Sequence, residues 1–390
     1  MIDYNMLINR TVLETKPSGI RKFFDIAENM DNVISLGVGE PDFATPWHIR
    51  QAGIQSLEDK KTRYTANRGI AGLRNEVSNY LFRRFNLKYD PKTDILITVG
   101  GSEGIDCAVR AVVNAGDEVI IPQPSFVCYE PIVRFAGGVP VFVNTVEENN
   151  FKLTAEQLKS AITDKTKLII LPYPCNPTGA IMSREDLEQI AEVIRETDIL
   201  ILSDEIYGEL TYGADHVSVA SIDGMSERTI LIGGFSKTYS MTGWRMGYAC
   251  ANSVIMKQMV KIHQFAIMSA PTTSQYASIE ALKNGDDDII RMRNQYDARR
   301  RLMVNGFNKI GLHCFEPKGA FYAFPSIKST GLSSDEFCEQ LLLKYHVAVI
   351  PGSAFGESGD GYIRASYCYS VEHIEEALHR IEKFINEIKG

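Results

Sequence analysis

The chain has 390 residues, of which 44% are hydrophobic and 23% are charged, and its formal net charge is −8. This size suits one large or two ordinary globular domains with an ample core, and an acidic balance without a basic cluster argues against a nucleic-acid partner. The N-terminal segment lacks the basic and then apolar order of a signal peptide, and no apolar run is long enough to cross a membrane. We therefore expect a cytoplasmic protein that has no membrane partner.

The seven cysteines and seven histidines are scattered along the chain. Neither a C-x-x-C string nor an H-E-x-x-H string is present. We therefore expect buried, reduced thiols and no metal site.

A glycine-rich segment over residues 33–43 follows a predicted helix over residues 19–29. It begins with apolar residues, which Gly37, Gly39 and Pro41 then interrupt. This order predicts a strand that ends in a loop where the backbone closely approaches another group. An ordinary turn explains the same pattern equally well.

A second glycine cluster, residues 100–104, lies between a predicted strand over 94–99 and a predicted helix over 105–113. The free N–H groups and the dipole of a helix N-terminus both favour an anion, so the turn predicts a phosphate site. A dinucleotide site is the competing interpretation. It fits poorly, because G-G-S-E-G is not spaced as G-x-G-x-x-G and no acidic residue closes a second strand about 20 residues later.

The middle of the chain alternates short apolar strands with helices. This alternation predicts an α/β fold with a mostly parallel sheet that helices cover on both faces. Ligands bind such sheets at the carboxyl ends of the strands. The predicted strands are 118–122, 139–143, 167–171, 199–202, 229–232 and 246–251. The predicted helices are 124–136, 154–162, 183–196, 253–266 and 272–283, the third of them with Ser183 as its N-cap.

Polar residues follow three of these strands: Asn176, then Asp204 and Tyr207, then Lys237. A carboxylate at the end of a buried strand is costly unless a cation pairs with it, which makes Asp204 a candidate for cofactor binding. A helix cap or a structural ion pair is the competing interpretation of an Asp at this position.

Lys237 lies in the string G-G-F-S-K-T-Y-S-M-T-G-W-R-M-G-Y, between two predicted strands. The hydroxyl of Ser236 and the guanidinium of Arg245 suit a phosphate group. A P-loop is disfavoured, because a serine and not a glycine precedes the lysine. An isolated lysine is most often a plain surface residue, so the interpretation depends on the surrounding pattern.

A long charged helix is predicted over residues 286–309, and a second alternation of strands and helices follows it. We expect a large domain over 47–285 and a smaller, discontinuous α+β domain over 1–46 and 286–390, joined by the long helix near 286–310. Arg364 lies on a strand that has no other charge, so it must meet an anion or stay at the sheet edge. The other elements predicted here are strands 320–324, 347–350 and 361–366 and helices 334–344 and 371–388.

Three strings occur together in this order: N-P-T-G at 176–179, S-D-E-I-Y at 203–207 and S-K-x-x-x-M-T-G-W-R-x-G-Y at 236–248. Together they resemble the class I and II aminotransferases, which have the aspartate aminotransferase fold and use pyridoxal 5′-phosphate. Within that family the chain is similar to bacterial N-acetyl-diaminopimelate and aromatic aminotransferases. The resemblance covers residues 36–364, which is nearly all of the chain.

The resemblance implies a role for each candidate residue around the cofactor. Lys237 forms the Schiff base with the cofactor and moves the substrate proton, Asp204 pairs with the ring nitrogen, and Asn176 and Tyr207 hydrogen-bond the phenolic oxygen. Phe126 stacks on the ring, where many relatives have Trp or Tyr. The implied phosphate ligands are Gly101, Ser102, Ser236 and Arg245, with Tyr64 serving the site of the partner subunit in a homodimer.

The resemblance also implies that Gly37, Asn176 and Arg364 bind the amino-acid and 2-oxo-acid substrates, with Arg364 holding the α-carboxylate. No string marks a second cation for a side-chain carboxylate; Arg21, Lys22 and Arg68 are candidates by position only. Ile20, Phe23 and Val38 offer apolar surface. We therefore expect transfer from aromatic or other bulky L-amino acids to 2-oxoglutarate. The alternatives are a C–S β-lyase of the same fold or an aspartate-preferring aminotransferase.

Overall fold

The computed structural model describes residues 2–17, 19 and 30–389. Apart from residue 19, the helix predicted over 19–29 lies outside the described residues, as do Ile20, Arg21, Lys22 and Phe23. The chain begins with the short helices η1 (Tyr4–Met6) and α1 (Arg10–Glu14). Within the described part of the chain, no helix is both long enough and apolar enough to span a membrane.

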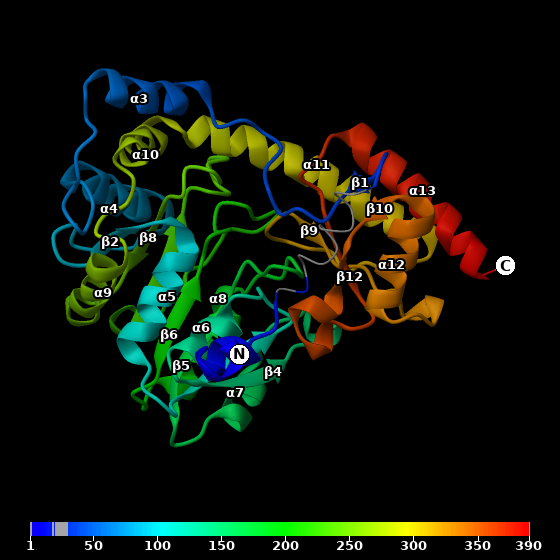
Figure 1. The fold of residues 1–390 in the computed structure, drawn as a ribbon, viewed down its shortest axis with the longest axis horizontal. Coiled ribbons are helices and arrows are strands. Elements are labelled where there is room, and N and C mark those ends of the chain that lie inside the picture. The colour runs from blue at the N-terminus through cyan, green and yellow to red at the C-terminus, as the bar shows by residue number, and fades with distance from the viewer. Residues whose placement is uncertain (1, 18, 20–29, 390) are drawn as a thin grey trace.

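A seven-stranded sheet forms the centre of the larger part of the molecule, with the strand order β2-β8-β7-β6-β5-β3-β4 (Figure 1). All neighbouring strands are parallel except β8, which is antiparallel to both β2 and β7. The mostly parallel sheet is therefore as predicted. The strands are β2 (Ile95–Thr98), β3 (Glu118–Gln123), β4 (Val139–Asn144), β5 (Thr166–Leu171), β6 (Leu200–Asp204), β7 (Thr229–Gly234) and β8 (Gly247–Cys250).

Helices cover both faces of this sheet. Successive side chains of a strand point to opposite faces, and in these strands the side chains on both faces are apolar, so both faces are packed against helices. In β5, Leu168 and Ile170 pack into one apolar cluster, and Ile169 and Leu171 pack into another. The first cluster includes side chains of α5 (Gly100–Val112), α6 (Tyr129–Phe135) and α9 (Ser253–Ala266). The second includes side chains of α7 (Ala155–Ala161) and α8 (Arg184–Ile194). A third cluster packs β2 against α3 (Trp47–Glu58), α4 (Ala71–Phe85) and α10 (Thr272–Asn284).

Two helix starts differ from the sequence prediction. The helix after β2 begins at Gly100 and not at 105, so the glycine cluster forms its first turn. The helix after β3 begins at Tyr129 and not at 124. In the segment before it, the N–H of Ser125 donates to the carbonyl of Phe355 (3.0 Å) and not to a carbonyl of a helical turn. The predicted N-cap Ser183 is confirmed, with a capping box to Asp186.

The long helix α11 (Asp286–Ile310) runs from the region of α10 to a second group of strands and helices (Figure 1). There, β1 (Ile34–Ser35) pairs in parallel with β10 (Val347–Ala348), and a three-stranded sheet has the order β11-β12-β9. The remaining elements are β9 (Tyr322–Ala323), α12 (Ser334–Tyr345), β11 (Ile350–Pro351), β12 (Ile363–Ser366) and α13 (Val371–Lys389). The 3₁₀ helices are η2 (Glu147–Asn149), η3 (Val219–Ser221), η4 (Ser226–Arg228), η5 (Lys328–Thr330), η6 (Gly352–Phe355) and η7 (Glu357–Gly359).

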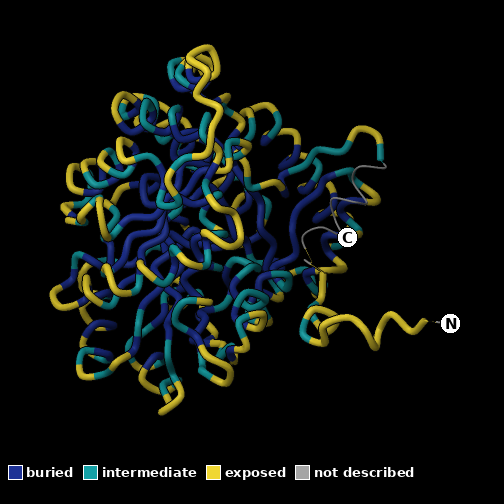
Figure 2. The backbone as a smooth tube through the Cα atoms, turned by 60° about the vertical axis from the view of Figure 1, so that its left-hand side comes forward, coloured by how far each residue is buried: buried dark blue, intermediate teal, exposed yellow. Residues whose placement is uncertain are grey.

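This second group has its own apolar cluster, built on α11, α12, α13 and the short strands. Tyr207, Leu210 and Tyr212, which follow β6 of the large sheet, belong to the same cluster. Figure 2 shows the buried interior of the chain and the exposed N-terminal segment that extends from it. The predicted domain boundaries stay a prediction.

Candidate active site

One cavity of about 310 Å³ lies where the carboxyl ends of β5, β6 and β7 meet the loop after β1 and the strands β9 and β12. The cavity collects residues that lie far apart in the sequence. The predicted site residues that line it are Gly37, Gly101, Ser102, Phe126, Asn176, Asp204, Tyr207, Ser236, Lys237, Arg245 and Arg364. Tyr64 does not line it, and Tyr129 and Tyr322 line it without having been predicted.

Lys237 lies in the turn between β7 and β8 and points into the cavity. Its ammonium donates a hydrogen bond to the carbonyl of Gly39 (2.7 Å) and lies 5.6 Å from the centre of the Phe321 ring. Burial lowers the pKa of this amine to about 8, because desolvation disfavours the charged form. With such a pKa about a tenth of the amine is neutral at pH 7, far more than for an ordinary lysine, and this neutral form can act as a base or a nucleophile.

The loop after β1 reaches Lys237 because of its glycines. A Cβ atom on Gly39 would lie 2.0 Å from the hydroxyl oxygen of Tyr322, so no larger residue fits there without displacement. The close backbone approach that the sequence predicts for residues 33–43 is confirmed at this position.

The start of α5 and the lysine turn together form a cradle for an anion. Gly101 and Ser102 lie in the first turn of α5, where backbone N–H groups have no partner inside the helix. Ser236 and Arg245 of the lysine turn also line the cavity. A Cβ atom on Gly100 would lie 2.7 Å from Nη2 of Arg245, so the glycine allows the guanidinium to approach the helix start.

Asp204 ends β6 and is 6% exposed. The hydroxyl of Tyr129 donates a hydrogen bond to Oδ2 (2.7 Å), and the backbone N–H of Ile206 donates one to Oδ1 (3.3 Å). Among the described residues, no Lys, Arg or His forms an ion pair with this carboxylate. Burial therefore raises the pKa of Asp204, and the Tyr129 hydrogen bond acts in the opposite direction. A cationic partner in the cavity would stabilise the ionised form.

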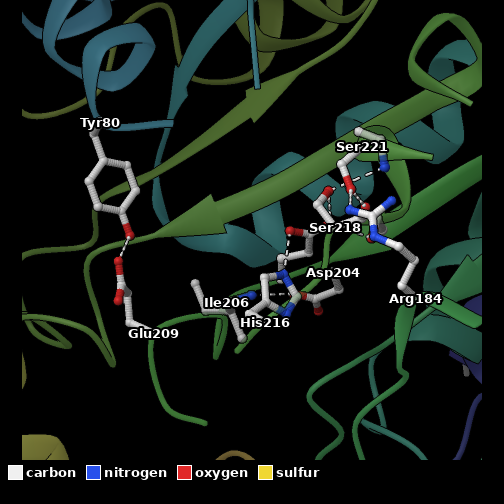
Figure 3. A network of polar contacts seen from close by, with 11 residues as sticks. Tyr80, Arg184, Asp204, Ile206, Glu209, His216, Ser218 and Ser221 are labelled. Atoms are coloured by element: carbon white, nitrogen blue, oxygen red, sulfur yellow. Dashed lines mark hydrogen bonds and ion pairs between the residues drawn. The ribbon is translucent and has the colours of Figure 1, made fainter. Parts of the chain in front are cut away.

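The neighbouring carboxylate of Glu205 belongs to a separate buried network. It accepts hydrogen bonds from Ser203 (2.8 Å) and Ser218 (2.6 Å), and its other oxygen contacts Nε2 of His216 (2.7 Å). Figure 3 shows Asp204 and Ile206 beside the His216 and Ser218 part of this network. Since Glu205 is satisfied by these partners, Asp204 is the carboxylate that remains available to the cavity.

Arg364 on β12 is 3% exposed and has no carboxylate partner among the described residues. Nη1 donates to Oδ1 of Asn176 (2.9 Å), and Nη2 donates to the carbonyl of Gly37 (2.6 Å). Nε is buried and has no hydrogen-bond partner within the part of the chain that the structure describes. Since a buried guanidinium without an anion is costly, this arrangement suits a carboxylate ligand. It also brings together the three residues that the sequence predicts for substrate binding.

Three tyrosines and one phenylalanine complete the cavity wall. The hydroxyl oxygens of Tyr207 and Tyr322 lie 2.8 Å apart. The ring of Tyr322 also stacks under Arg364, whose Cζ lies 4.4 Å from the ring centre. Phe126 lines the cavity beside Tyr129, with the two rings edge to face at 5.9 Å. No sequence string marks Tyr322, because the apolar pattern around it is that of an ordinary strand.

Tyr64 is the predicted residue that lies apart from this site. Its side chain is 84% exposed. Arg68 also lies outside the cavity lining, and its guanidinium donates to the carbonyl of Thr93 (2.5 Å). Within the described residues, no group of three or more His, Cys, Asp or Glu side chains is placed to hold a metal ion.

The sequence profile of the family described as aminotransferase class I and II matches residues 31–381. The chain belongs to this family. It is 53% identical to a putative aminotransferase of Bacillus subtilis, YugH, over 96% of this chain and 97% of that one. It is 46% identical to an aspartate aminotransferase of Pyrococcus abyssi, with the same coverage of both chains. The crystal structure of an aromatic aminotransferase from Pyrococcus horikoshii superimposes with a TM-score of 0.90 at 44% identity, covering 94% of this chain and 99% of that chain.

The enzyme is therefore a pyridoxal-phosphate-dependent aminotransferase. The residues that line the cavity fit this cofactor. The helix start, Ser236 and Arg245 suit its phosphate, the amine of Lys237 suits its aldehyde, and the buried carboxylate of Asp204 suits its ring nitrogen.

Proposed function

We propose that the enzyme transfers the amino group of aromatic or other bulky L-amino acids to 2-oxoglutarate. The observation that carries this proposal is the pairing of two groups in one cavity. Lys237 has a lowered pKa, and Arg364 is buried without an anionic partner among the described residues. A substrate whose α-carboxylate meets Arg364 would present its α-carbon to the same cavity as the lysine amine.

Each residue of the site then has a defined task. The cofactor, when bound, supplies an electron-withdrawing ring that acidifies the α-proton of the amino acid. Nζ of Lys237 accepts that proton as the general base. The carboxylate of Asp204 holds a proton on the ring nitrogen. With the cofactor bound, Asn176 and Tyr207 would donate to its phenolic oxygen, and Phe126 would pack against its ring.

The preference for apolar side chains follows from the charges that line the cavity. Among its described lining residues the cations are Lys237, Arg245 and Arg364, and the proposal gives each of them another partner. The side-chain carboxylate of a donor such as aspartate would then be desolvated without a fixed cation, which is unfavourable. The second carboxylate of the acceptor 2-oxoglutarate would instead be met by a mobile arginine that is not part of this lining. Val38, which is 37% exposed and lines the cavity, offers apolar surface instead.

A substrate panel tests this preference. We expect kcat/KM for phenylalanine and tyrosine to exceed that for aspartate by about tenfold, which corresponds to ~1.4 kcal/mol of transition-state free energy. Aspartate, alanine and N-acetyl-diaminopimelate complete the panel, each measured against 2-oxoglutarate. The variant Val38→Ala should lower kcat/KM for phenylalanine and leave the value for alanine unchanged. A tenfold preference for aspartate over the aromatic donors would contradict the proposal.

The same assay separates transamination from a C–S β-lyase reaction. Transamination yields one glutamate for each 2-oxo acid formed from the donor. A β-lyase acting on a cysteine conjugate would instead release a thiol, pyruvate and ammonia without consuming 2-oxoglutarate.

We also propose that the enzyme is a homodimer with composite sites, in which Tyr64 contacts the cofactor phosphate of the neighbouring subunit. This is supported by the exposure of Tyr64 outside the cavity of its own chain. Exposed apolar side chains on nearby segments, such as Trp47 (58%) and Phe265 (87%), are suited to an interface.

Mixing two impaired variants tests this arrangement. Tyr64→Ala and Lys237→Ala chains, unfolded and refolded together, should regain about a quarter of wild-type activity, because half of the dimers are hybrids and each hybrid has one intact site. Each variant refolded alone is the control. A fully active monomer in sedimentation would contradict the composite site.

We further propose the two-domain division at residues 47 and 285 and a location in the cytoplasm. The first is supported by the separate apolar cluster around α11, α12 and α13. The second is supported by the cysteines, which are all free and of which all but Cys128 are buried.

A further inference from the structure

Asp204 receives a hydrogen bond from one side chain only among the described residues, and that side chain is Tyr129. The hydroxyl of Tyr129 lies 2.7 Å from Oδ2, and both residues are buried, at 2% and 6% exposure. Tyr129 lies in the first turn of α6 and bonds a different carboxylate oxygen from the one that the backbone of Ile206 bonds. The carboxylate is thus held through each of its oxygens by a different element.

The other titratable groups near Asp204 do not compete for this role. Glu205 is bound to Ser203, Ser218 and His216. Desolvation raises the pKa values of the Cys128 and Cys175 thiols, so they stay neutral. Tyr129 itself stays protonated, because burial raises its pKa. Its hydroxyl is therefore a permanent donor to Asp204.

We propose that Tyr129 is a positioning residue that keeps the Asp204 carboxylate ionised and oriented toward the ring nitrogen of the cofactor. This inference rests on the proposed role of Asp204. A buried carboxylate tends to take up a proton, and a hydrogen bond from a neutral donor favours the ionised form instead. Without the hydroxyl, Asp204 would keep only the 3.3 Å contact from Ile206, and a larger fraction of it would be neutral and free to rotate.

The packing of Tyr129 makes a conservative test possible. Its ring meets the ring of Phe126 edge to face at 5.9 Å, with an interplanar angle of 88°. The variant Tyr129→Phe keeps this contact and the cavity wall and removes only the oxygen atom. Tyr173→Phe is the matched control. Tyr173 is a buried tyrosine whose hydroxyl accepts from the Leu153 N–H (2.9 Å) and donates to the Phe151 carbonyl (3.1 Å), outside the cavity lining.

The first measurement uses the protein without cofactor. Carboxyl ¹³C NMR of aspartate-labelled protein, with the Asp204 signal assigned by Asp204→Ala, gives the pKa of this group directly. We expect Tyr129→Phe to raise that pKa by about one unit and Tyr173→Phe to leave it unchanged. An unchanged pKa in Tyr129→Phe would overturn the proposal.

The second measurement is a double-mutant cycle on the enzyme loaded with pyridoxal phosphate. Tyr129→Phe should lower kcat by about tenfold or more, which is the range for a hydrogen bond to a charged group, with KM for the amino acid nearly constant. In an Asp204→Ala background the same change should have no further effect. Tyr129→His, which keeps a donor, should recover part of the loss and provides a second variant if Tyr129→Phe does not fold.

The outcomes separate the two proposals. If Asp204→Ala retains kcat, the proposed role of Asp204 is wrong. If Asp204→Ala loses activity and Tyr129→Phe behaves like the wild type, the role of Asp204 stands and that of Tyr129 is refuted. Equal losses for Tyr129→Phe in both backgrounds would also refute it, because the tyrosine would then act independently of Asp204.

Discussion

Replacing Lys237 with alanine is expected to lower kcat by ~10²–10⁴-fold through the loss of the general base alone. The purified variant should still bind pyridoxal phosphate, because the start of α5, Ser236 and Arg245 do not depend on the lysine. It should, however, lack the absorption band of a cofactor linked to lysine. Difference spectra and steady-state kinetics on the same preparation measure both effects.

A surface lysine provides the control for this prediction. Lys344 forms an exposed ion pair with Glu387 (2.7 Å), and Lys344→Ala should keep both the spectrum and kcat of the wild type. Reduction of the wild-type holoenzyme with borohydride, followed by peptide mapping, identifies the modified residue. The assignment fails if the cofactor is found on another lysine.

Replacing Asp204 with alanine is expected to have the second largest effect, a loss of kcat of ~10²-fold or more. The ring nitrogen would lose the anion that keeps it protonated, so the ring would withdraw electrons less strongly. Affinity for pyridoxal phosphate should fall much less, because the phosphate contacts remain. Titration of the apoprotein with cofactor and measurement of kcat separate the two quantities.

Asp164, an exposed carboxylate that does not line the cavity, serves as the matched control. Asp164→Ala should leave both values unchanged. Near-normal turnover in Asp204→Ala would show that the ring nitrogen needs no carboxylate in this enzyme.

The parts of the fold that the sequence predicts well are those governed by local patterns. The strands of the large sheet are short apolar runs, and α9 matches its predicted bounds of 253–266, because periodicity decides both. The sequence predicts the start of α5 five residues too late, because glycines in the first turn of a helix resemble a loop in sequence. The helix α6 was placed too early, because the long-range contact of Ser125 with Phe355 that holds its preceding segment is not encoded nearby.

The same contrast holds for the site. Lys237, Asp204 and Asn176 stand in strings with a strong family signature, and the structure brings them to one cavity. The sequence does not predict Tyr129 and Tyr322 as site residues, because each lies in an apolar stretch that is typical of a buried core. Helical spacing from Phe126 does not mark Tyr129 either, because Phe126 lies in the segment before α6 and not on the helix. For Tyr322, only the folded chain shows that β9 borders the cavity.

The apolar cluster that joins Tyr207, Leu210 and Tyr212 to α11 and α13 limits how this protein can be divided. A fragment of residues 47–285 would contain Lys237 and Asp204, but it would expose these three side chains to water. Tyr207 lines the cofactor cavity, so this part of the cavity wall also belongs to the interior of the second group of strands and helices. Residues 47–285 alone are therefore not expected to form a working site, because Tyr322 and Arg364 of the rest of the chain complete the cavity wall.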